Sequence, residues 1–476
     1  METGEIRQRV SELIALIRNN FLNPEGLVAR DYPPGQRTLF DHFDDWAPFF
    51  LYFGEEDFLR SQLALVSERG ENLVSCCSED GVLVTRNVDE WFGGLYAVWK
   101  ATGDRNAWAL LRASVNFALE KLIHGKFLTA AYYVESGRRV PYYECWSAGL
   151  LEALCEMRQE FPAAFEAAQR ILRAWIQDEY FERYHLFPYR MYLSMSSRLM
   201  QRWLVSRIPI PASQRPSKRL PLQPLSLRGI LKQLRRQVCG DKPPRGHRTS
   251  ALAEEICREV YLRCLNGYYS QLTKSNSACA FALLEFYLAT GEELYLHALD
   301  SWLEAALGGF CEGGKVYLQL YPASNFRKRE PGAAQALILV DLICDASFYL
   351  PAFRKWLPRA KEILDYYLED RMDNGLIPYH VGGEYAHLDS QVDFAISLRR
   401  YGELNQNAHY LELSANLVQK ALQQHYTPDG YLTYSGKVGK NVIDPKYNAL
   451  LLKGMIHLLT LHQPLYPDLV DLFKDR

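Results

Sequence analysis

Carboxylates beside aromatic residues recur at the starts of apolar helical segments. The pattern occurs in FDHFDDW at 40–46, NVDEW at 87–91, PYYECW at 141–146 and LDSQVDF at 388–394. Aromatic faces stack on the apolar faces of sugar rings, while carboxylates accept hydrogen bonds from sugar hydroxyls. Two carboxylates also suffice to cleave a glycosidic bond, one as general acid and the other as base or nucleophile. The pattern therefore predicts chemistry on a carbohydrate.

These segments supply the candidate site residues. We expect Asp89 and Glu144 to be the catalytic acid and base, with Asp389 and Asp393 as the next candidates. Asp389 and Asp393 are four residues apart, so one helical face can carry both. The expected substrate-binding residues come from the same segments and from the loop DNGLIPYH at 373–380: Asp41, Asp44, Trp46, Glu90, Trp91, Tyr143, Trp146, Tyr379 and His380.

An acid at a helix start also has a structural explanation. It caps free backbone N–H groups and complements the helix dipole, which stabilises the helix by about 0.5–2 kcal/mol. Asp444 is the clearest cap, because Pro445 suits the first helical position. The separation of the catalytic carboxyl groups decides between retention and inversion, and the sequence leaves it open.

The chain has to place these residues with helices. Apolar residues recur at helical spacing in many segments, and these segments alternate between two kinds. Segments such as 277–289 and 446–460 are apolar on most sides, whereas 105–123 and 408–424 are amphipathic. A helix that is apolar all round is buried and an amphipathic one lies outside, so the alternation predicts a ring of inner and outer helices.

The connections fit such a ring. Short turns lead from inner to outer helices, and longer loops return to the next inner helix, so the long loops gather on one face. Inner helices are expected near 43, 90, 144, 275, 333, 390 and 446. We therefore predict one all-α domain, an (α/α)6 or (α/α)7 toroid over residues 1–476. A solenoid is the competing architecture.

Two segments, DEWFGGLYAVWKATGD at 89–104 and SNSACAFALLEFYLATGEELYLHAL at 275–299, give the chain a resemblance to a known superfamily. They resemble the six-hairpin (α/α)6 toroids, which include glycoside hydrolases, polysaccharide lyases and sugar epimerases. The helix that begins Trp-Phe-Gly-Gly after an acid is most similar to that of unsaturated glucuronyl hydrolases. The resemblance implies that Asp89 is a general acid and base and that aromatic residues surround a sugar.

The net charge of −2 hides a strong asymmetry. Residues 198–248 hold 13 Lys or Arg and one acid, so this stretch carries +12 and the remaining chain carries −14. Prolines at 209, 211, 216, 221 and 224 exclude a long helix there. We expect residues 205–248 to form a basic insertion in a hairpin loop. It is either a solvated loop or a docking element for an anionic membrane surface or an acidic partner, and nucleic acid is not the expected target.

Several other classes of protein lack support. The sequence contains no GxxxxGK[ST] or GxGxxG, no HExxH and no CxxC pair, so no cofactor and no metal is expected. Ten scattered cysteines favour buried thiols and a cytoplasmic location over a disulfide framework. No apolar stretch reaches the length of a spanning helix, so any association with a membrane is predicted to be peripheral.

Two functions fit the sequence. The first is a carbohydrate-active enzyme that hydrolyses a glycosidic bond of an oligosaccharide or polysaccharide, with a lyase or an epimerase as variants. A substrate that contains uronic acid is considered, with Arg86 near Asp89 or Arg138 and Arg139 before Glu144 as its partners. The second is a non-catalytic toroid that binds a glycan or a protein and docks through its basic insertion.

Overall fold

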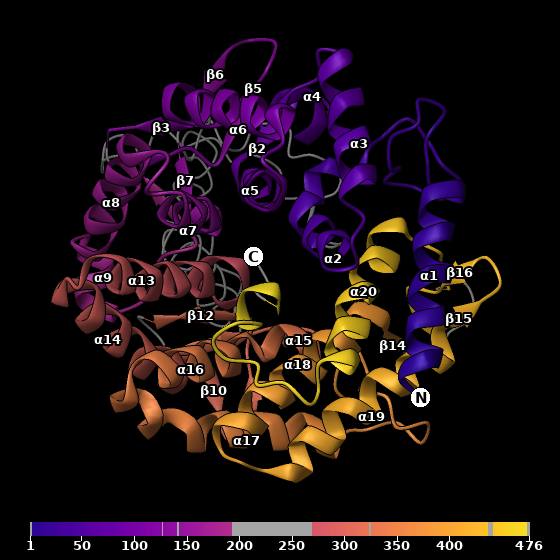
Figure 1. Ribbon diagram of the computed structural model, residues 1–476. Helices are drawn as coiled ribbons and strands as arrows, with labels where there is room; N and C mark the ends of the chain where they lie inside the picture. Colours follow the sequence, from indigo (N-terminus) through magenta and orange to yellow (C-terminus); the bar gives the residue numbers. More distant parts are fainter. Residues whose placement is uncertain are drawn as a thin grey trace, which may run out of the picture.

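The chain forms a closed ring of helical hairpins (Figure 1). The computed structural model describes residues 2–125, 127–139, 142–192, 269–322, 325–436 and 441–473. Within these residues each hairpin places one helix toward the centre of the ring and one on the outside. The prediction of an all-α toroid is confirmed.

Seven inner positions line the ring in the described part of the chain. Each inner helix packs on the next, and the last returns to the first. They start at the seven predicted places, so the described residues form seven hairpins. In order they are α2 (Ala47–Tyr52) with the preceding turn η1 (Leu39–Asp45), α5 (Val88–Thr102), α7 (Gly149–Glu156) after η4 (Cys145–Ala148), α13 (Ser277–Thr290) after η6 (Leu272–Asn276), α16 (Ile338–Tyr349) after α15 (Ala333–Ala336), α18 (Leu388–Leu404) and α20 (Pro445–Leu459).

The outer helices cover this inner ring. They are α3 (Glu56–Glu68), α6 (Arg105–Phe117), α8 (Pro162–Ile176), α14 (Glu293–Gly309), α17 (Leu357–Glu369), α19 (Ala408–His425) and α1 (Thr3–Asn20). Helix α1 packs on α20, so the two ends of the chain build the last hairpin together. Shorter elements lie between the long helices: α4 (Leu73–Cys77), α9 (Glu179–Tyr184), η2 (Thr85–Asn87), η3 (Ala118–Leu122) and η8 (Pro351–Trp356). The short helix η9 (Val470–Phe473) follows α20 at the C-terminal end.

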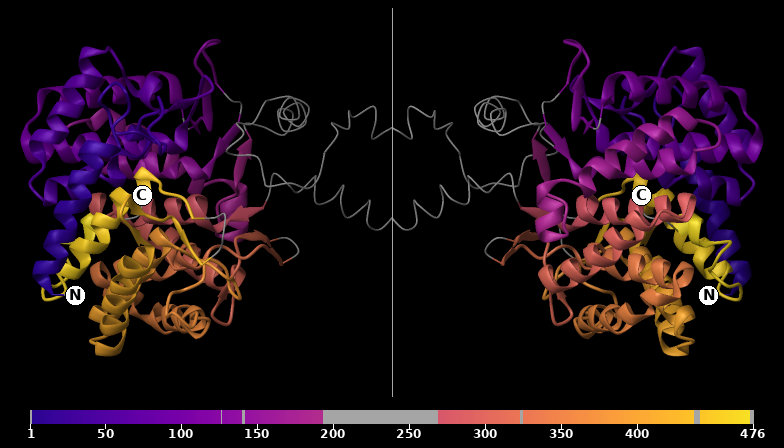
Figure 2. Two further views of the ribbon diagram at one scale, coloured as in Figure 1. Left: turned by 90° about the vertical axis from the view of Figure 1, so that its right-hand side faces the viewer. Right: turned by 90° about the vertical axis from the view of Figure 1, so that its left-hand side faces the viewer.

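The long loops carry short antiparallel strands. One sheet joins β1 (Ser78–Glu79), β2 (Val82–Val84), β5 (Ala131–Tyr133) and β6 (Arg138–Arg139), and another joins β9 (Ser270–Gln271), β12 (Gln319–Tyr321) and β13 (Phe326–Lys328). The two-stranded pairs are β7 (Tyr142–Glu144) with β8 (Arg190–Tyr192), β14 (Ala386–His387) with β17 (Tyr434–Ser435), β3 (Ile123–His124) with β4 (Phe127–Leu128), β10 (Cys311–Glu312) with β11 (Lys315–Val316), and β15 (Tyr426–Thr427) with β16 (Gly430–Tyr431). Figure 2 shows strands of the middle loops at one end of the ring, with both chain termini toward the other end.

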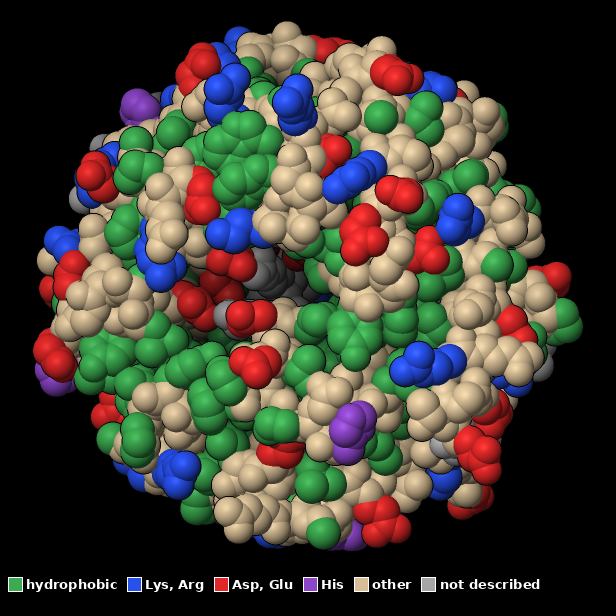
Figure 3. Space-filling model, viewed as in Figure 1, with side chains coloured by type: hydrophobic (Ala, Val, Ile, Leu, Met, Phe, Trp, Pro, Cys, Tyr) green, Lys and Arg blue, Asp and Glu red, His purple; other side chains and the backbone are tan. Residues whose placement is uncertain are grey.

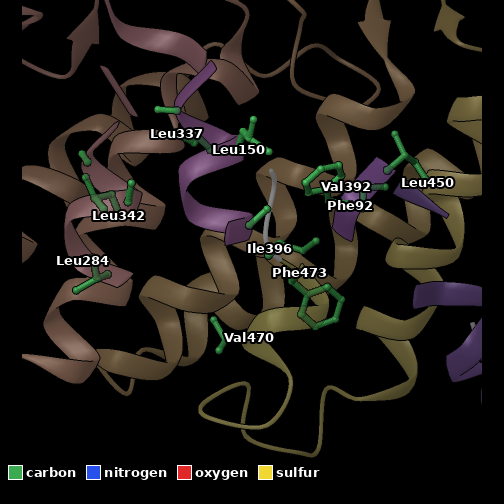
Figure 4. Packing of buried hydrophobic residues seen from close by; sticks show 14 of the residues in the cluster. Phe92, Leu150, Leu284, Leu337, Leu342, Val392, Ile396, Leu450, Val470 and Phe473 are labelled. Atoms are coloured by element: carbon green, nitrogen blue, oxygen red, sulfur yellow. The ribbon is translucent and has the colours of Figure 1, made fainter. Parts of the chain in front are cut away.

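The core runs between the inner and outer helices and reaches the C-terminal segment. Val470 and Phe473 of η9 are 1% exposed and pack into the same apolar cluster as Ile396 (Figure 4). The segment after α20 is thereby fixed across one end of the ring. Among the described residues, none of the helices combines the length and apolar character needed to cross a bilayer.

Two sequence predictions concern the cysteines and the basic insertion. The cysteines that the structure describes are buried free thiols, as predicted: Cys76, Cys77, Cys145, Cys155, Cys279, Cys311 and Cys344. The predicted insertion at 205–248 lies outside the described residues. The residues that flank the gap are held together, since the Tyr189 amide donates to the Tyr269 carbonyl at 2.7 Å and the two rings stack.

Candidate functional site

A cavity of about 310 Å³ occupies the centre of the ring. Its wall contains seven carboxylates from five inner positions: Asp45, Asp89, Glu90, Glu152, Asp341, Asp389 and Asp393. The cationic side chains in the wall are those of Arg86 and Lys446. Convergence of inner-helix acids on one cavity was the main prediction from the sequence, and the structure brings Asp89, Asp389, Asp393 and Glu90 there.

The first and last inner positions meet in a charged cluster at this cavity. Lys446 of α20 places Nζ 2.7 Å from Asp45 Oδ2 and 2.9 Å from Nδ1 of His42, both on η1. His42 Nδ1 also contacts Glu90 of α5 and lies 3.4 Å from Asp45 Oδ2. The cluster therefore joins residues more than 400 positions apart and closes the ring.

The charges in this cluster hold one another ionised. Burial alone would raise the pKa of Asp45, but the Lys446 ammonium and His42 lower it well below its usual range. The pKa of Glu90 is lowered for the same reason, against the effect of burial. Burial would lower the pKa of Lys446, yet Asp45 and Glu90 raise it. All three side chains carry their charge at neutral pH.

Asp389 lies where strand β14 ends and helix α18 begins. Its Oδ1 accepts from the backbone N–H of Ser390 at 2.6 Å, and the side chain contacts Nδ1 of His387. The Ser390 hydroxyl is a further donor at 3.3 Å. These contacts hold the Asp389 carboxylate in one orientation at the cavity wall.

Asp89 is held at the start of α5 against the first turn of α7. Asp89 is 5% exposed, and it lines the cavity. The carboxylate lies directly over Gly149, because a Cβ built on Gly149 would come within 1.9 Å of Asp89 Oδ2. The Asp89 carboxylate can therefore occupy this position only because residue 149 has no side chain.

Aromatic rings form one side of the cavity around His387. The His387 ring centroid lies 4.4 Å from Tyr434, 4.8 Å from Tyr447 and 5.3 Å from Tyr379. The three tyrosines line the cavity with His387. Burial and the nearby Asp389 carboxylate raise the pKa of Tyr379 to about 12, so its hydroxyl keeps its proton. The placement of Tyr379 beside the acids matches its predicted position.

Two other wall carboxylates have cationic partners behind the cavity. Asp393 accepts from Lys453 Nζ at 3.1 Å, and Lys453 is 3% exposed. Asp341 lies 3.8 Å from Nε of Arg400. Asp389 and Asp393 both face the cavity, as their spacing on one helix predicted.

The prediction that Trp46 and Trp91 face a ligand is wrong. Both are 0% exposed and pack with Phe40 and Phe43 in the core. Their indole N–H groups donate inside the protein, from Trp46 to the Leu39 carbonyl and from Trp91 to the Ser114 hydroxyl. Neither ring has a free face for a sugar.

Three other predicted binding residues do not line the central cavity. Asp41 borders a separate pocket with Cys76 and Cys77, and His380 turns its Nδ1 toward the Pro331 carbonyl at 3.4 Å. Asp44 faces a smaller hollow of about 200 Å³. Asp45 and Leu450 border both this hollow and the main cavity. Figure 3 shows a hollow edged by acidic side chains near the middle of the face that carries the C-terminal segment.

For three predicted site residues, the structure describes the backbone but not the side chain. The backbone of Tyr143 and Glu144 belongs to strand β7, and Trp146 belongs to η4. The side chains of Tyr143, Glu144 and Trp146 lie outside the described part of the structure. Their roles stay predictions.

Sequence reasoning missed several residues of the wall. The main omissions are Asp45, Glu152, Asp341, His387, Tyr434, Lys446 and Tyr447. A signal existed for several of them, since Asp45 belongs to the segment FDHFDDW and Tyr447 to the helix start after Asp444. His387 stands two positions before Asp389, and Lys446 directly follows the Asp444-Pro445 helix start.

The comparisons with known proteins agree with this architecture. No family model and no curated protein sequence matches the chain. Among solved structures, an α-1,2-mannosidase from Trichoderma reesei superposes with a TM-score of 0.63 at 10% identity, covering 96% of this chain and 93% of that one. The fold is that of the (α/α) toroid enzymes.

Two further solved structures share this fold. D-mannose isomerase has a TM-score of 0.54 at 9% identity, with 96% of this chain and 98% of that chain covered. A cellobiose 2-epimerase from Spirochaeta thermophila has a TM-score of 0.52 at 10% identity, with 86% and 98% covered. The resemblance to unsaturated glucuronyl hydrolases stays a prediction.

Proposed function

We propose that this chain is a carbohydrate-active enzyme that hydrolyses a glycosidic bond in its central cavity. The observation that carries the proposal is the convergence of seven carboxylates and three tyrosines on one space of about 310 Å³. Pockets that bind small molecules start at about this size. The mannosidase and sugar epimerases with the same fold support a sugar as the ligand.

Asp389 and Asp89 are our candidates for the reacting pair. Asp389 is fixed at the wall by contacts with His387 and Ser390 and serves as the base that activates water or as the nucleophile. Asp89 is buried at the wall over Gly149 and donates the proton to the leaving oxygen. Glu144 is the alternative partner that the sequence suggests.

The charge of the wall favours a neutral sugar. Seven acidic side chains face two cationic ones, and Lys446 already binds Asp45. A uronate would meet repulsion from this wall, in which Arg86 is the cationic side chain besides Lys446. We therefore place neutral hexosides ahead of the uronic-acid substrates considered from the sequence.

The test is a set of sugar assays on the purified full chain. The substrates are α-1,2-mannobiose, cellobiose and an unsaturated uronyl disaccharide, and the products are identified by chromatography and NMR. Release of monosaccharide from a neutral disaccharide, absent in Asp389→Asn, supports the proposal. No hydrolysis of any glycoside at enzyme concentrations of tens of micromolar would overturn it.

One observation favours a second function. His387 lines the cavity with its Nδ1 against Asp389, so its other ring nitrogen is a candidate base for removing a proton from a sugar carbon beside a carbonyl. The same assays separate the two functions. An epimerase or isomerase changes the sugar and leaves the glycosidic bond intact.

The Gly149→Ala variant tests the position of Asp89. The added methyl would displace the Asp89 carboxylate, and a shift of about 1 Å in a catalytic group lowers the rate by about a hundredfold. We expect this loss in turnover, with overpacking that destabilises the fold by about 1–3 kcal/mol. Turnover and denaturant unfolding measure the two effects.

Gly308→Ala is the matched control for this prediction. Gly308 also lies in a helix, α14, but a Cβ there meets nothing within 4 Å. This variant should keep full turnover and gain up to about 1 kcal/mol, since alanine favours a helix over glycine. Equal turnover in Gly149→Ala and Gly308→Ala would remove Asp89 from the reacting pair.

A further inference from the structure

Three side chains from two elements converge on one point beside the central cavity. Single ligand atoms of His42, Asp45 and Glu90 all lie within 4.8 Å of one another. His42 and Asp45 belong to η1, and Glu90 belongs to the first turn of α5. One imidazole with two carboxylates is a donor set that zinc and other divalent transition metals accept.

The ammonium group of Lys446 already stands at this point. Its Nζ is 2.7 Å from Asp45 Oδ2 and 2.9 Å from His42 Nδ1, and the side chain is 15% exposed. Lys446 follows Pro445 at the start of α20. A cation is unfavourable near a helix N-terminus, so the acids of the cluster must offset the helix dipole to keep it there.

The contacts of His42 Nδ1 fit a bound cation better than a closed hydrogen-bond network. This nitrogen meets both the Lys446 ammonium and the Glu90 carboxylate. It carries either one hydrogen or one lone pair, so it serves a donor or an acceptor but not both. A metal ion would accept electron pairs from the imidazole and from both carboxylates at once.

We propose that the Lys446 ammonium occupies a set of divalent-metal ligands formed by His42, Asp45 and Glu90. We further propose that removing this amine allows zinc to bind there. The amine supplies the positive charge that the buried Glu90 and the partly buried Asp45 need, without dependence on a metal ion. It also ties the last inner helix to the first. This inference does not rest on the proposed function, since its test needs no substrate.

The test compares Lys446→Met with Lys453→Met and the wild type. Methionine keeps the length and apolar stem of lysine and removes the charge. Lys453 is the matched control, because it lies on the same helix, is buried and pairs with the Asp393 carboxylate. Zn²⁺ binding is measured by calorimetry on the full chain, and the unfolding temperature is measured with and without Zn²⁺.

We expect Lys446→Met to bind one Zn²⁺ at least about tenfold more tightly than the wild type or Lys453→Met, and to regain unfolding temperature when Zn²⁺ is added. Adding His42→Ala to Lys446→Met should abolish the gain. Equal Zn²⁺ binding in the three proteins, or a gain that survives His42→Ala, would overturn the proposal. If Lys446→Met does not fold alone, Zn²⁺-dependent recovery of its circular dichroism supports the proposal and failure to recover overturns it.

Discussion

Replacing Asp89 with asparagine is expected to lower turnover by about a thousandfold while the ring stays folded. Loss of a general acid costs about 10² to 10⁴ in rate. Asparagine keeps the size of the side chain, so the close fit over Gly149 is preserved and no cavity is created. The measurement is turnover on whichever glycoside the wild type cleaves, with circular dichroism and the unfolding midpoint as checks on the fold.

Further variants and a control test whether the loss in Asp89→Asn comes from the reaction itself. Asp389→Asn should lose activity to a similar degree, and the double variant should be little worse than either single one, because the two groups act in one reaction. Glu304→Gln on the outer helix α14 is the control, since Glu304 is exposed. If Asp89→Asn keeps more than about a tenth of the activity while Glu144→Gln loses it, Glu144 takes the role assigned to Asp89.

The helical period was enough to predict the ring. Inner helices are apolar on most sides because they pack against two neighbours and an outer helix, and this leaves a strong trace in segments such as Ser277–Thr290. The cap at Asp444 was also readable, since its side chain accepts from the Lys446 amide at 2.9 Å. Local composition encodes both features.

The sequence did not reveal which residues of the first inner segment face the cavity. The turn η1 contains a break at His42, where φ is −132° and ψ is 42°. The break rotates the residues after it, so that Asp45 reaches the cavity and Trp46 turns into the core. The sequence analysis named Asp41 and Asp44 as binding residues, and the structure places Asp45 in the cavity wall instead. A single non-helical residue is decided by packing and leaves no periodic signal.

The sequence did not predict the ion-pair partners of the site residues, and the reason is different. Lys446 and His42 are 404 positions apart, and their contact exists only because the ring closes. Asp393 and Lys453, 60 positions apart, meet in the same way across two inner helices. Helical spacing reports which residues share a face, but not which face of another helix lies opposite. Four of the seven wall carboxylates were therefore predictable from helix starts, and their counter-charges were not.

Arg400→Ala is expected to destabilise the fold strongly. Arg400 is 2% exposed, places Nη1 2.5 Å from Asp345 Oδ2 and donates from Nη2 to the Phe473 carbonyl at 3.0 Å. Asp345 is also 2% exposed and accepts from the Tyr466 hydroxyl. Truncation leaves the Asp345 charge buried without its cation, which costs about 3–5 kcal/mol. Denaturant unfolding measures this loss.

The exposed pair of Lys355 and Asp300 provides the control. Their side chains are 52% and 43% exposed at 2.7 Å, so Lys355→Ala should cost no more than about 1 kcal/mol. The double variant Arg400→Met with Asp345→Leu should recover most of the stability lost in Arg400→Ala, because it removes the orphaned charge and refills the space. It should not restore the bond to the Phe473 carbonyl, so the tail at 460–473 should exchange its amide hydrogens faster in both variants. Protection of that tail at the wild-type level in Arg400→Ala would show that apolar packing of η9, rather than Arg400, fixes the end of the ring.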